Sequence, residues 1–388
     1  MTDFIYETPV KIYFGRDQLC HLSPELAKYG SKVLLTYGGG SIKKTGLYGQ
    51  VVSQLEENGF EISELSGIEP NPRVDSVRKG AQICKEKGID VVLAVGGGSV
   101  IDASKWIAAG ACADCDVWDF FTAAETPQKA LPLVTILTLA ATGSEMNMNG
   151  VISNPETNEK KGCSSPLLYP KVSFLNPELT YSVNRYQTAC GSADIMSHIM
   201  ETYFNDGDGM YLLDSFMETM MKTVVKYTPV ALEKPDDYEA RANLMWTSSW
   251  AISRFSRACQ TCKWSCHSME HELSAFYDIT HGLGLAILTP RWMKYCLCED
   301  NVDRYVKFAV NVFGVDATLA PMEIAMQGIA KLEEFFFETL GLDDNFAKID
   351  IDDKLFETMA VKACKGKTIN GFKTLTPEDV VNIYRMCL

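Results

Sequence analysis

The sequence lacks a run of 18 apolar residues, an excess of positive charge and the pattern of a secretory signal. Without a long apolar run, a membrane-spanning helix is excluded. The net charge of −14 produces a field that repels nucleic-acid phosphates. The opening residues, MTDFIYETPVKIYFG, have no basic segment followed by an apolar one. We therefore expect a cytoplasmic protein that binds neither membranes nor nucleic acid.

Cysteine, in contrast, is plentiful. The chain has 13 cysteines, an odd number, and without a secretory signal this favours reduced thiols over a disulfide framework. Cys259, Cys262 and Cys266 are close enough in sequence to suggest a zinc or iron–sulfur site. Structural zinc sites, however, usually have four ligands in two separated pairs, and free cysteine is common in helix cores. We favour the second interpretation here, and more strongly for Cys112 and Cys115.

The first part of the chain alternates between short apolar runs and helical patterns. At 388 residues, the chain is long enough for about two to three domains. Continuous apolar runs are typical of strands that are covered on both faces, and strand–helix alternation predicts a parallel α/β sheet. An edge hairpin is expected before the sheet. The predicted strands are 32–37, 90–95, 132–137 and 171–175, and the predicted helices are 44–59, 73–88 and 99–111.

Strand patterns nearly vanish from about residue 185 onward. Helical spacing predicts long helices over 182–205, 210–227, 238–255 and 319–340. We therefore expect an α/β domain over 1–180 and an all-helical domain over 181–388. Two domains of different class suggest a site in a cleft between them.

Two predicted strands end in the same tetrapeptide, Gly-Gly-Gly-Ser, at 38–41 and at 96–99. Glycines let a backbone approach a phosphate, and a helix N-terminus offers free N–H groups. Two such turns after parallel strands favour nucleotide binding over ordinary tight turns, although the G-x-G-x-x-G fingerprint is absent.

The first glycine turn also bears on the choice of nucleotide. Its sequence, GGGSIKKTG, has no acid to bind a free ribose hydroxyl but contains Ser41, Lys43 and Lys44. Small donors and cations suit a 2′-phosphate, so the sequence favours NADP over NAD. The alternative is that both lysines belong to the solvated face of a helix.

Histidine is scarce, and four of the five histidines lie in the second half of the chain. Asp194 and His198 are four residues apart, as are His267 and His271, so each pair shares a helical face. A mixed oxygen and nitrogen set with His281 suits Zn²⁺ or Fe²⁺ rather than Ca²⁺ or Mg²⁺. Spacing alone leaves open which three of the four imidazoles bind.

The hydroxyls and amide of the segment 138–147 follow the third predicted strand, at the strand end where α/β folds bind ligands. Ordinary turn chemistry is the alternative for this segment. Together with the glycine turns and the histidines, it resembles the iron-containing (group III) alcohol dehydrogenase family over essentially the whole chain. The matching motifs are Phe14-Gly15, Asn71-Pro72, GGGSVID at 96–102 with Lys105, TLAATGSE at 138–145, Asp194-x-x-x-His198, His267-x-x-x-His271 and His281-Gly282.

The resemblance implies a dehydroquinate synthase-like architecture and a dimer, because members often associate through the N-terminal hairpin. It implies four metal ligands, Asp194, His198, His267 and His281, and leaves His271 to face the nicotinamide and the substrate. It also implies cofactor contacts at Gly39, Gly40, Ser41, Asn71, Gly97, Gly98, Ser99, Asp102, Thr138, Thr142, Asn147, Lys160 and Leu179.

The resemblance is strongest to NADPH-dependent butanol dehydrogenases and aldehyde reductases. We therefore expect hydride transfer between NADPH and short-chain aldehydes such as butanal, assisted by one Fe or Zn ion. A metal- and NAD-dependent lyase or cyclase of the dehydroquinate synthase type is the first alternative. Its phosphate-bearing substrate needs several cations near the metal, and Lys263 is the only one from 260 to 290. A non-catalytic nucleotide sensor is the second alternative.

Overall fold

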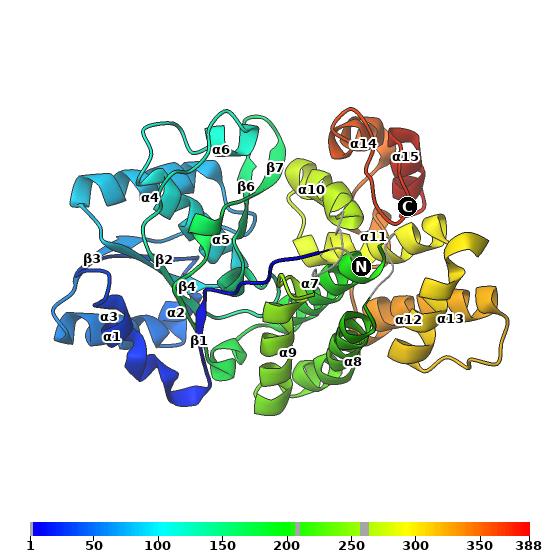
Figure 1. The fold of residues 1–388 in the computed structure, drawn as a ribbon, viewed down its shortest axis with the longest axis horizontal. Helices are drawn as coiled ribbons and strands as arrows, with labels where there is room; N and C mark the ends of the chain where they lie inside the picture. The colour runs from blue at the N-terminus through cyan, green and yellow to red at the C-terminus, as the bar shows by residue number, and fades with distance from the viewer. Residues whose placement is uncertain (1–2, 206–209, 257–263) are drawn as a thin grey trace. The chain divides into compact units, whose positions relative to one another are not determined.

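The computed structural model describes residues 3–205, 210–256 and 264–388, which form two compact units. One unit consists of residues 7–183, and the other consists of residues 184–388 together with the first residues up to Tyr6. Figure 1 shows strands and helices in the first unit, whereas the second unit is built from helices.

The first unit is built on a six-stranded sheet with the order β1-β8-β5-β4-β2-β3, in which all neighbouring strands are parallel. The strands β4, β5 and β8 are buried along their whole length, as their continuous apolar sequences predict. The sheet strands are β1 (Lys11–Phe14), β2 (Lys32–Tyr37), β3 (Glu61–Leu65), β4 (Val91–Gly96), β5 (Leu133–Leu137) and β8 (Val172–Leu175).

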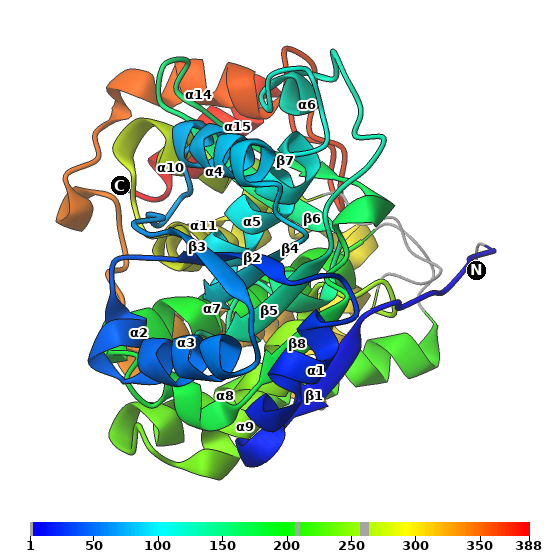
Figure 2. The same ribbon diagram turned by 90° about the vertical axis from the view of Figure 1, so that its left-hand side faces the viewer.

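Helices cover both faces of this sheet. In Figures 1 and 2, α4 and α5 lie on one face, and α1, α2 and α3 lie on the other. The helices of this unit are η1 (Arg16–His21), α1 (Leu22–Leu26), α2 (Ser41–Lys44), α3 (Leu47–Glu57), α4 (Val74–Lys87), α5 (Gly98–Gly110), α6 (Asp119–Thr122), η2 (Ser144–Met146), η3 (Pro166–Leu168) and η4 (Pro177–Thr180).

The strand order reverses between β2 and β4. The chain leaves β2 for its neighbour β3 on one side and then returns to β4 on the other side. The two strands pair with Tyr37 opposite Val95, so both glycine turns emerge side by side at the same carboxyl edge. In open α/β sheets, ligands bind at this kind of switch point.

The structure corrects one prediction about the first unit and adds one feature to it. The expected edge hairpin is absent from the described residues 3–14, where β1 is the only strand and runs parallel to β8. Pro9 has no N–H group for a ladder, and Phe4 and Ile5 are exposed. An antiparallel ribbon of β6 (Asn149–Asn154) and β7 (Glu159–Ser164), which the sequence patterns did not predict, lies against α5.

The second unit has one large apolar core, formed by the buried faces of its helices. The predicted helices are present, although the one expected over 238–255 ends at Ala251. The helices are α7 (Arg185–Tyr203), α8 (Tyr211–Glu233), α9 (Tyr238–Ala251), α10 (Ser265–Tyr277), α11 (His281–Cys296), η5 (Glu299–Asn301), α12 (Val302–Phe313), α13 (Pro321–Glu333), the π-helical η6 (Glu334–Thr339), η7 (Ala347–Ile349), η8 (Asp353–Leu355), α14 (Phe356–Ala363) and α15 (Pro377–Arg385).

Among the helices that the structure describes, none is both long and apolar enough to cross a bilayer. The cysteines in the described ranges are free thiols. Cys259 and Cys262 lie outside the described residues, as does Lys263, while Cys266 is buried in α10.

Candidate functional site

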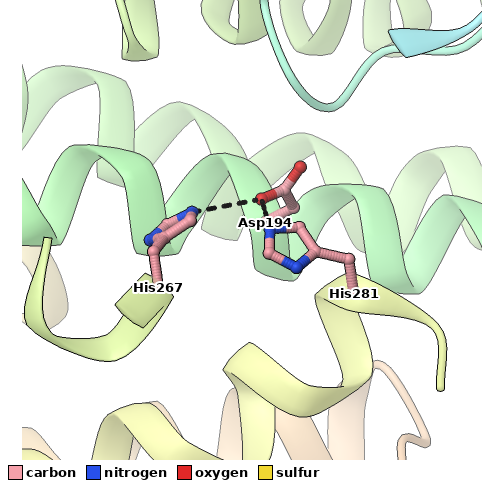
Figure 3. A group of neighbouring side chains, drawn as sticks. All are labelled: Asp194, His267 and His281. Carbon is pink, nitrogen blue, oxygen red and sulfur yellow. Dashed lines mark ion pairs between the residues drawn. The ribbon is translucent and has the colours of Figure 1, made fainter. Parts of the chain in front are cut away.

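Three side chains of the helical unit converge on one point. The carboxylate of Asp194, on α7, lies 3.8 Å from the Nε2 atom of His267, on α10, and 3.8 Å from the Nε2 atom of His281, on α11 (Figure 3). The ligand atoms of these three residues all lie within 4.8 Å of one another. The structure thus brings together three of the four residues that the resemblance implies as metal ligands.

His198, the fourth of these residues, lies one helical turn after Asp194 on α7. Its Nδ1 atom is 3.4 Å from Asp194 Oδ1, and its ring stacks on the ring of His267 with centroids 4.7 Å apart. The indole of Trp264 packs edge-on against both imidazoles. His198 therefore borders the same carboxylate, on the side of His267.

The donor atoms are arranged as a cation site requires. Asp194 Oδ1 and His267 Nε2 are buried and make no hydrogen bond within the part of the chain that the structure describes. Burial of polar atoms without hydrogen bonds is costly, and a bound cation removes that cost. One carboxylate oxygen with imidazole nitrogens is a donor set that suits Fe²⁺ or Zn²⁺. The residues present therefore fit a divalent metal.

The electrostatics of the cluster keep its carboxylate ionised. Burial raises the pKa of the Asp194 carboxyl, but the surrounding imidazoles outweigh burial and bring this pKa to about 2. For His267, burial lowers the pKa, whereas the carboxylates of Asp194 and Glu201 raise it to about 9. Asp194 thus offers a negatively charged oxygen over the whole neutral pH range.

Two buried glutamates complete the cluster, and neither was predicted from the sequence. Glu201 Oε1 lies 3.3 Å from Nδ1 of His267, and the Glu270 carboxylate contacts Nδ1 of His281. Helical spacing was a usable signal for each. Glu201 follows Asp194 by seven residues on the same face of α7, and Glu270 follows His267 by three.

His271 lies beside this cluster rather than at its centre. Its ring centroid is 5.7 Å from that of His281 and 6.4 Å from that of His267. It shares a second group of possible ligands with Glu270 and His281. It is half-buried.

In the first unit, the second glycine turn and the segment after β5 are in direct contact. The Thr138 N–H group donates to the carbonyl of Gly96, and a Cβ on Gly98 would lie 2.3 Å from Oγ1 of Thr142. A side chain at position 98 would therefore separate the turn from this segment. Gly97 precedes α5 as its N-cap, and Ser99 is in its first turn.

Lys105 is a fully buried lysine that ties α5 to the same segment. Its ammonium donates to Ser144 Oγ (2.8 Å), Asn147 Oδ1 (3.0 Å) and the Asn149 carbonyl (2.6 Å). Burial lowers the Lys105 pKa to about 8. Asp102, one turn earlier on α5, accepts from Ser144 Oγ at 2.5 Å and from the N–H of Val151 at 2.9 Å, so both of its oxygens are used inside the fold.

Ser153 of β6 links the segment that contains Asn71 to the strand that contains Lys160. The Ser153 N–H group donates to the carbonyl of Pro72, next to Asn71, and Ser153 faces Lys160 in the β6–β7 register. Asn71 has a φ of 50°, in the left-handed region that asparagine tolerates. Leu179 lies in η4 and packs against the core of the sheet.

The first glycine turn is open around Gly39 and Gly40, where an added Cβ would meet no atom within 4 Å. Gly40, with a φ of 102°, leads into α2, which Ser41 begins. The Lys43 ammonium lies over the rings of Tyr37 (5.2 Å) and Tyr48 (4.5 Å).

The phenols of Tyr37 and Tyr48 both donate to the carboxylate of Glu64, on β3. An acid absent from the turn sequence is therefore close to its lysine in the fold. Nothing in GGGSIKKTG indicated this acid, because β3 was not among the predicted strands and β2 pairs with it through the backbone.

Family models and known proteins match the chain over most of its length. The model described as "Iron-containing alcohol dehydrogenase" matches residues 9–177, and "Fe-containing alcohol dehydrogenase family, C-terminal" matches residues 188–388. NADH-dependent butanol dehydrogenase B of Clostridium acetobutylicum is 49% identical over 387 residues, which cover 99% of each chain. NADPH-dependent aldehyde reductase YqhD of Escherichia coli is 36% identical over 359 residues, covering 91% of this chain and 90% of that protein.

A solved structure gives the same result for the fold. The crystal structure of NADH-dependent butanol dehydrogenase A from Thermotoga maritima superposes with a TM-score of 0.95 at 38% identity, covering 100% of this chain and 99% of the other. Both halves of the chain thus match one family in sequence and in fold. The chain belongs to the iron-containing alcohol dehydrogenase family.

Proposed function

We propose that this chain is an NADP(H)-dependent alcohol dehydrogenase that interconverts short-chain aldehydes, such as butanal, with their alcohols. The observation that carries the proposal is the convergence of His267 and His281 on the buried carboxylate of Asp194. A family member with this cluster has the donor set for a metal that acts on a carbonyl oxygen. The printed names of relatives, which include butanol dehydrogenases and an aldehyde reductase, support the substrate class.

The proposed metal ligands are Asp194, His198, His267 and His281. When bound, a divalent Fe or Zn ion would act as a Lewis acid toward the substrate oxygen. With the three imidazoles neutral, the four side chains would carry one negative charge, so a divalent ion would leave the site with a net positive charge, which favours an alkoxide over an alcohol. The buried positions of Asp194, His198 and His267 also keep water away from this side of the site.

His271 is the proposed catalytic residue. It is adjacent to the ligand cluster and half-buried, so its imidazole can hold a proton near a bound substrate. We assign it delivery of the proton to the alkoxide oxygen, directly or through a water molecule.

The proposed cofactor site follows the carboxyl edge of the sheet. Gly97, Gly98 and Ser99 would hold the pyrophosphate at the N-terminus of α5, a 13-residue helix. The open turn at Gly39, Gly40 and Ser41 would hold the adenosine ribose with its 2′-phosphate. The nicotinamide half would contact the side chains of the segment after β5 and its neighbours, and the remaining proposed contacts are Asn71, Asp102, Thr138, Thr142, Asn147, Lys160 and Leu179.

The preference for NADP rests on Ser41, Lys43 and Lys44, while relatives are named both NADH-dependent and NADPH-dependent. We further propose a cytoplasmic homodimer in which residues 1–180 bind the nucleotide and residues 181–388 bind the metal.

One assay tests the reaction, the metal and the cofactor together. Butanal is supplied with NADPH or NADH, before and after chelation, and the loss of reduced-nicotinamide absorbance is followed. We expect faster turnover with NADPH, loss of turnover on chelation, and recovery with Fe²⁺ or Zn²⁺. Turnover that survives complete metal removal would contradict the Lewis-acid role. An enzyme that binds NADPH but reduces no short aldehyde would contradict the proposed substrate class.

A further inference from the structure

Two buried glutamates contact His267 and His281 on the ring nitrogens that face away from Asp194. Glu201 reaches Nδ1 of His267 at 3.3 Å, while Nε2 of the same ring faces Asp194. The Glu270 carboxylate reaches Nδ1 of His281, whose Nε2 also faces Asp194. The two glutamates are 5% and 0% exposed, respectively. Each imidazole is thus held between two carboxylates, one at each nitrogen.

This arrangement selects one tautomer of each ring. A carboxylate can only accept a hydrogen bond, so it favours the imidazole that carries its proton on the contacted nitrogen. With Nδ1–H directed at a glutamate, the lone pair of the neutral ring is on Nε2, which points toward Asp194. The glutamates therefore favour the form in which both rings offer a metal-binding nitrogen to the same point.

The packing around each glutamate holds it in place. Glu201 Oε1 also accepts the backbone N–H of His267 at 2.8 Å, which joins α7 to the first turn of α10. Glu270 accepts from the hydroxyl of Ser274, one turn along its own helix. A Cβ on Gly284 would lie 2.8 Å from Cγ of Glu270, so α11 leaves space for this side chain only because residue 284 is glycine.

We infer that Glu201 and Glu270 are positioning residues, which fix the orientation and tautomer of His267 and His281 and thereby strengthen metal binding. The inference rests on the proposed metal site. Carboxylates in this position orient ligating histidines and raise their basicity, and their loss typically weakens metal affinity by about 10- to 100-fold. Both glutamates contact the ring nitrogens that face away from Asp194, so their effect on turnover acts through the histidines.

The test compares Glu201→Leu and Glu270→Leu with Glu201→Gln and Glu270→Gln. Leucine removes the acceptor, whereas glutamine keeps an acceptor oxygen without the charge. Zn²⁺ affinity is measured by competition with a chelator, and the absorption spectrum of the Co²⁺-loaded protein reports the ligand geometry. We expect affinity about 10- to 100-fold weaker in the leucine variants, a smaller loss in the glutamine variants, and an altered Co²⁺ spectrum.

Glu218 is the matched control. It is buried in α8 and accepts a hydrogen bond from Tyr203 at 2.7 Å, with no histidine among its hydrogen-bond or ion-pair partners within the described ranges. Glu218→Leu is expected to destabilise the metal-free protein and to leave Zn²⁺ affinity unchanged. Equal affinity in the wild type and in the Glu201 and Glu270 variants would overturn the inference while leaving the proposed function intact. A wild-type protein that binds no divalent metal would overturn both.

Discussion

Gly282 lies directly against the backbone of Cys190, and a Cβ on Gly282 would be 2.0 Å from the Cys190 carbonyl oxygen. Gly282 is the second residue of α11, directly after His281, and Cys190 is one turn before Asp194 on α7. The missing side chain lets the first turn of α11 touch α7. This contact brings His281 to within 3.8 Å of Asp194.

We therefore expect Gly282→Ala to push the two helices apart. Overpacking of this kind costs about 1–3 kcal/mol of unfolding free energy. His281 would also move away from Asp194, so Zn²⁺ affinity should fall as well. Denaturant unfolding of the metal-free protein and chelator competition measure the two effects separately.

Gly49→Ala is the matched control for this substitution. Gly49 is exposed on α3, and an added Cβ there would meet no atom within 4 Å. Alanine should stabilise this helix by about 0.5–1 kcal/mol without altering metal affinity. If Gly282→Ala behaves like Gly49→Ala, the close contact with Cys190 does not position His281.

His271→Ala should separate metal binding from catalysis. Because His271 lies beside the group formed by Asp194, His267 and His281 and is not a member of it, we expect the variant to keep its metal and to bind NADPH normally. Loss of a general acid lowers kcat by about 10²- to 10⁴-fold. Metal analysis, NADPH titration and turnover with butanal are the measurements. A variant that loses its metal would identify His271 as a ligand, in a group with Glu270 and His281.

The sequence was sufficient to predict the strands that are covered on both faces. Continuous apolar runs predicted β2, β4, β5 and β8 to within one residue at either end. The sequence did not predict β3 or the β6–β7 ribbon, because their polar residues resemble loop sequences. These segments form strands because they pair with neighbouring strands. The N-terminal hairpin was predicted from an apolar segment, but Phe4 and Ile5 in that segment are exposed and Tyr6 packs against Phe255 of the helical unit.

The sequence could suggest the candidate metal ligands but not the glutamates that contact them. Spacing within one helix relates Asp194 to His198, but the contact among α7, α10 and α11 depends on tertiary packing. Glu270 could be placed on the His267 face of α10 from the sequence, yet its contact with His281 depends on that meeting. For the same reason, the sequence could not predict that Glu64 lies close to the first glycine turn.

The burial of Lys105 should make the free energy of unfolding depend on pH in the alkaline range. Burial lowers its pKa from 10.5 to about 8 in the folded protein, so between these values the unfolded chain binds more protons than the folded one. The free energy of unfolding should therefore rise with pH in this window, by about 3 kcal/mol for this residue. Urea unfolding of the wild type and of Lys105→Met isolates the effect, because only the wild type has it.

Lys105→Met also tests the role of the segment after β5. Without three hydrogen bonds to Ser144, Asn147 and Asn149, that segment should lose order, and NADPH should bind more weakly. Below pH 7 the stability difference between the two proteins should be independent of pH, which serves as an internal control. Parallel stability curves from pH 8 to 10.5 would show that folding does not lower the Lys105 pKa.

The choice between NADP and NAD should respond to Glu64. Its carboxylate binds the phenols of Tyr37 and Tyr48, whose rings lie under the Lys43 ammonium, so it offsets the positive field of the first glycine turn. Glu64→Gln removes that negative charge and keeps a hydrogen-bond acceptor. A charge interaction of about 1 kcal/mol would raise the ratio of kcat/KM for NADPH to that for NADH roughly 5-fold.

Lys43→Ala should lower the same ratio, because it removes a positive charge from the turn. Both changes should shrink as salt is added, since exposed charges are screened. The ratio is measured with butanal at low and high ionic strength. If neither variant changes it, the 2′-phosphate does not bind at this turn, and the preference must come from another part of the cofactor site.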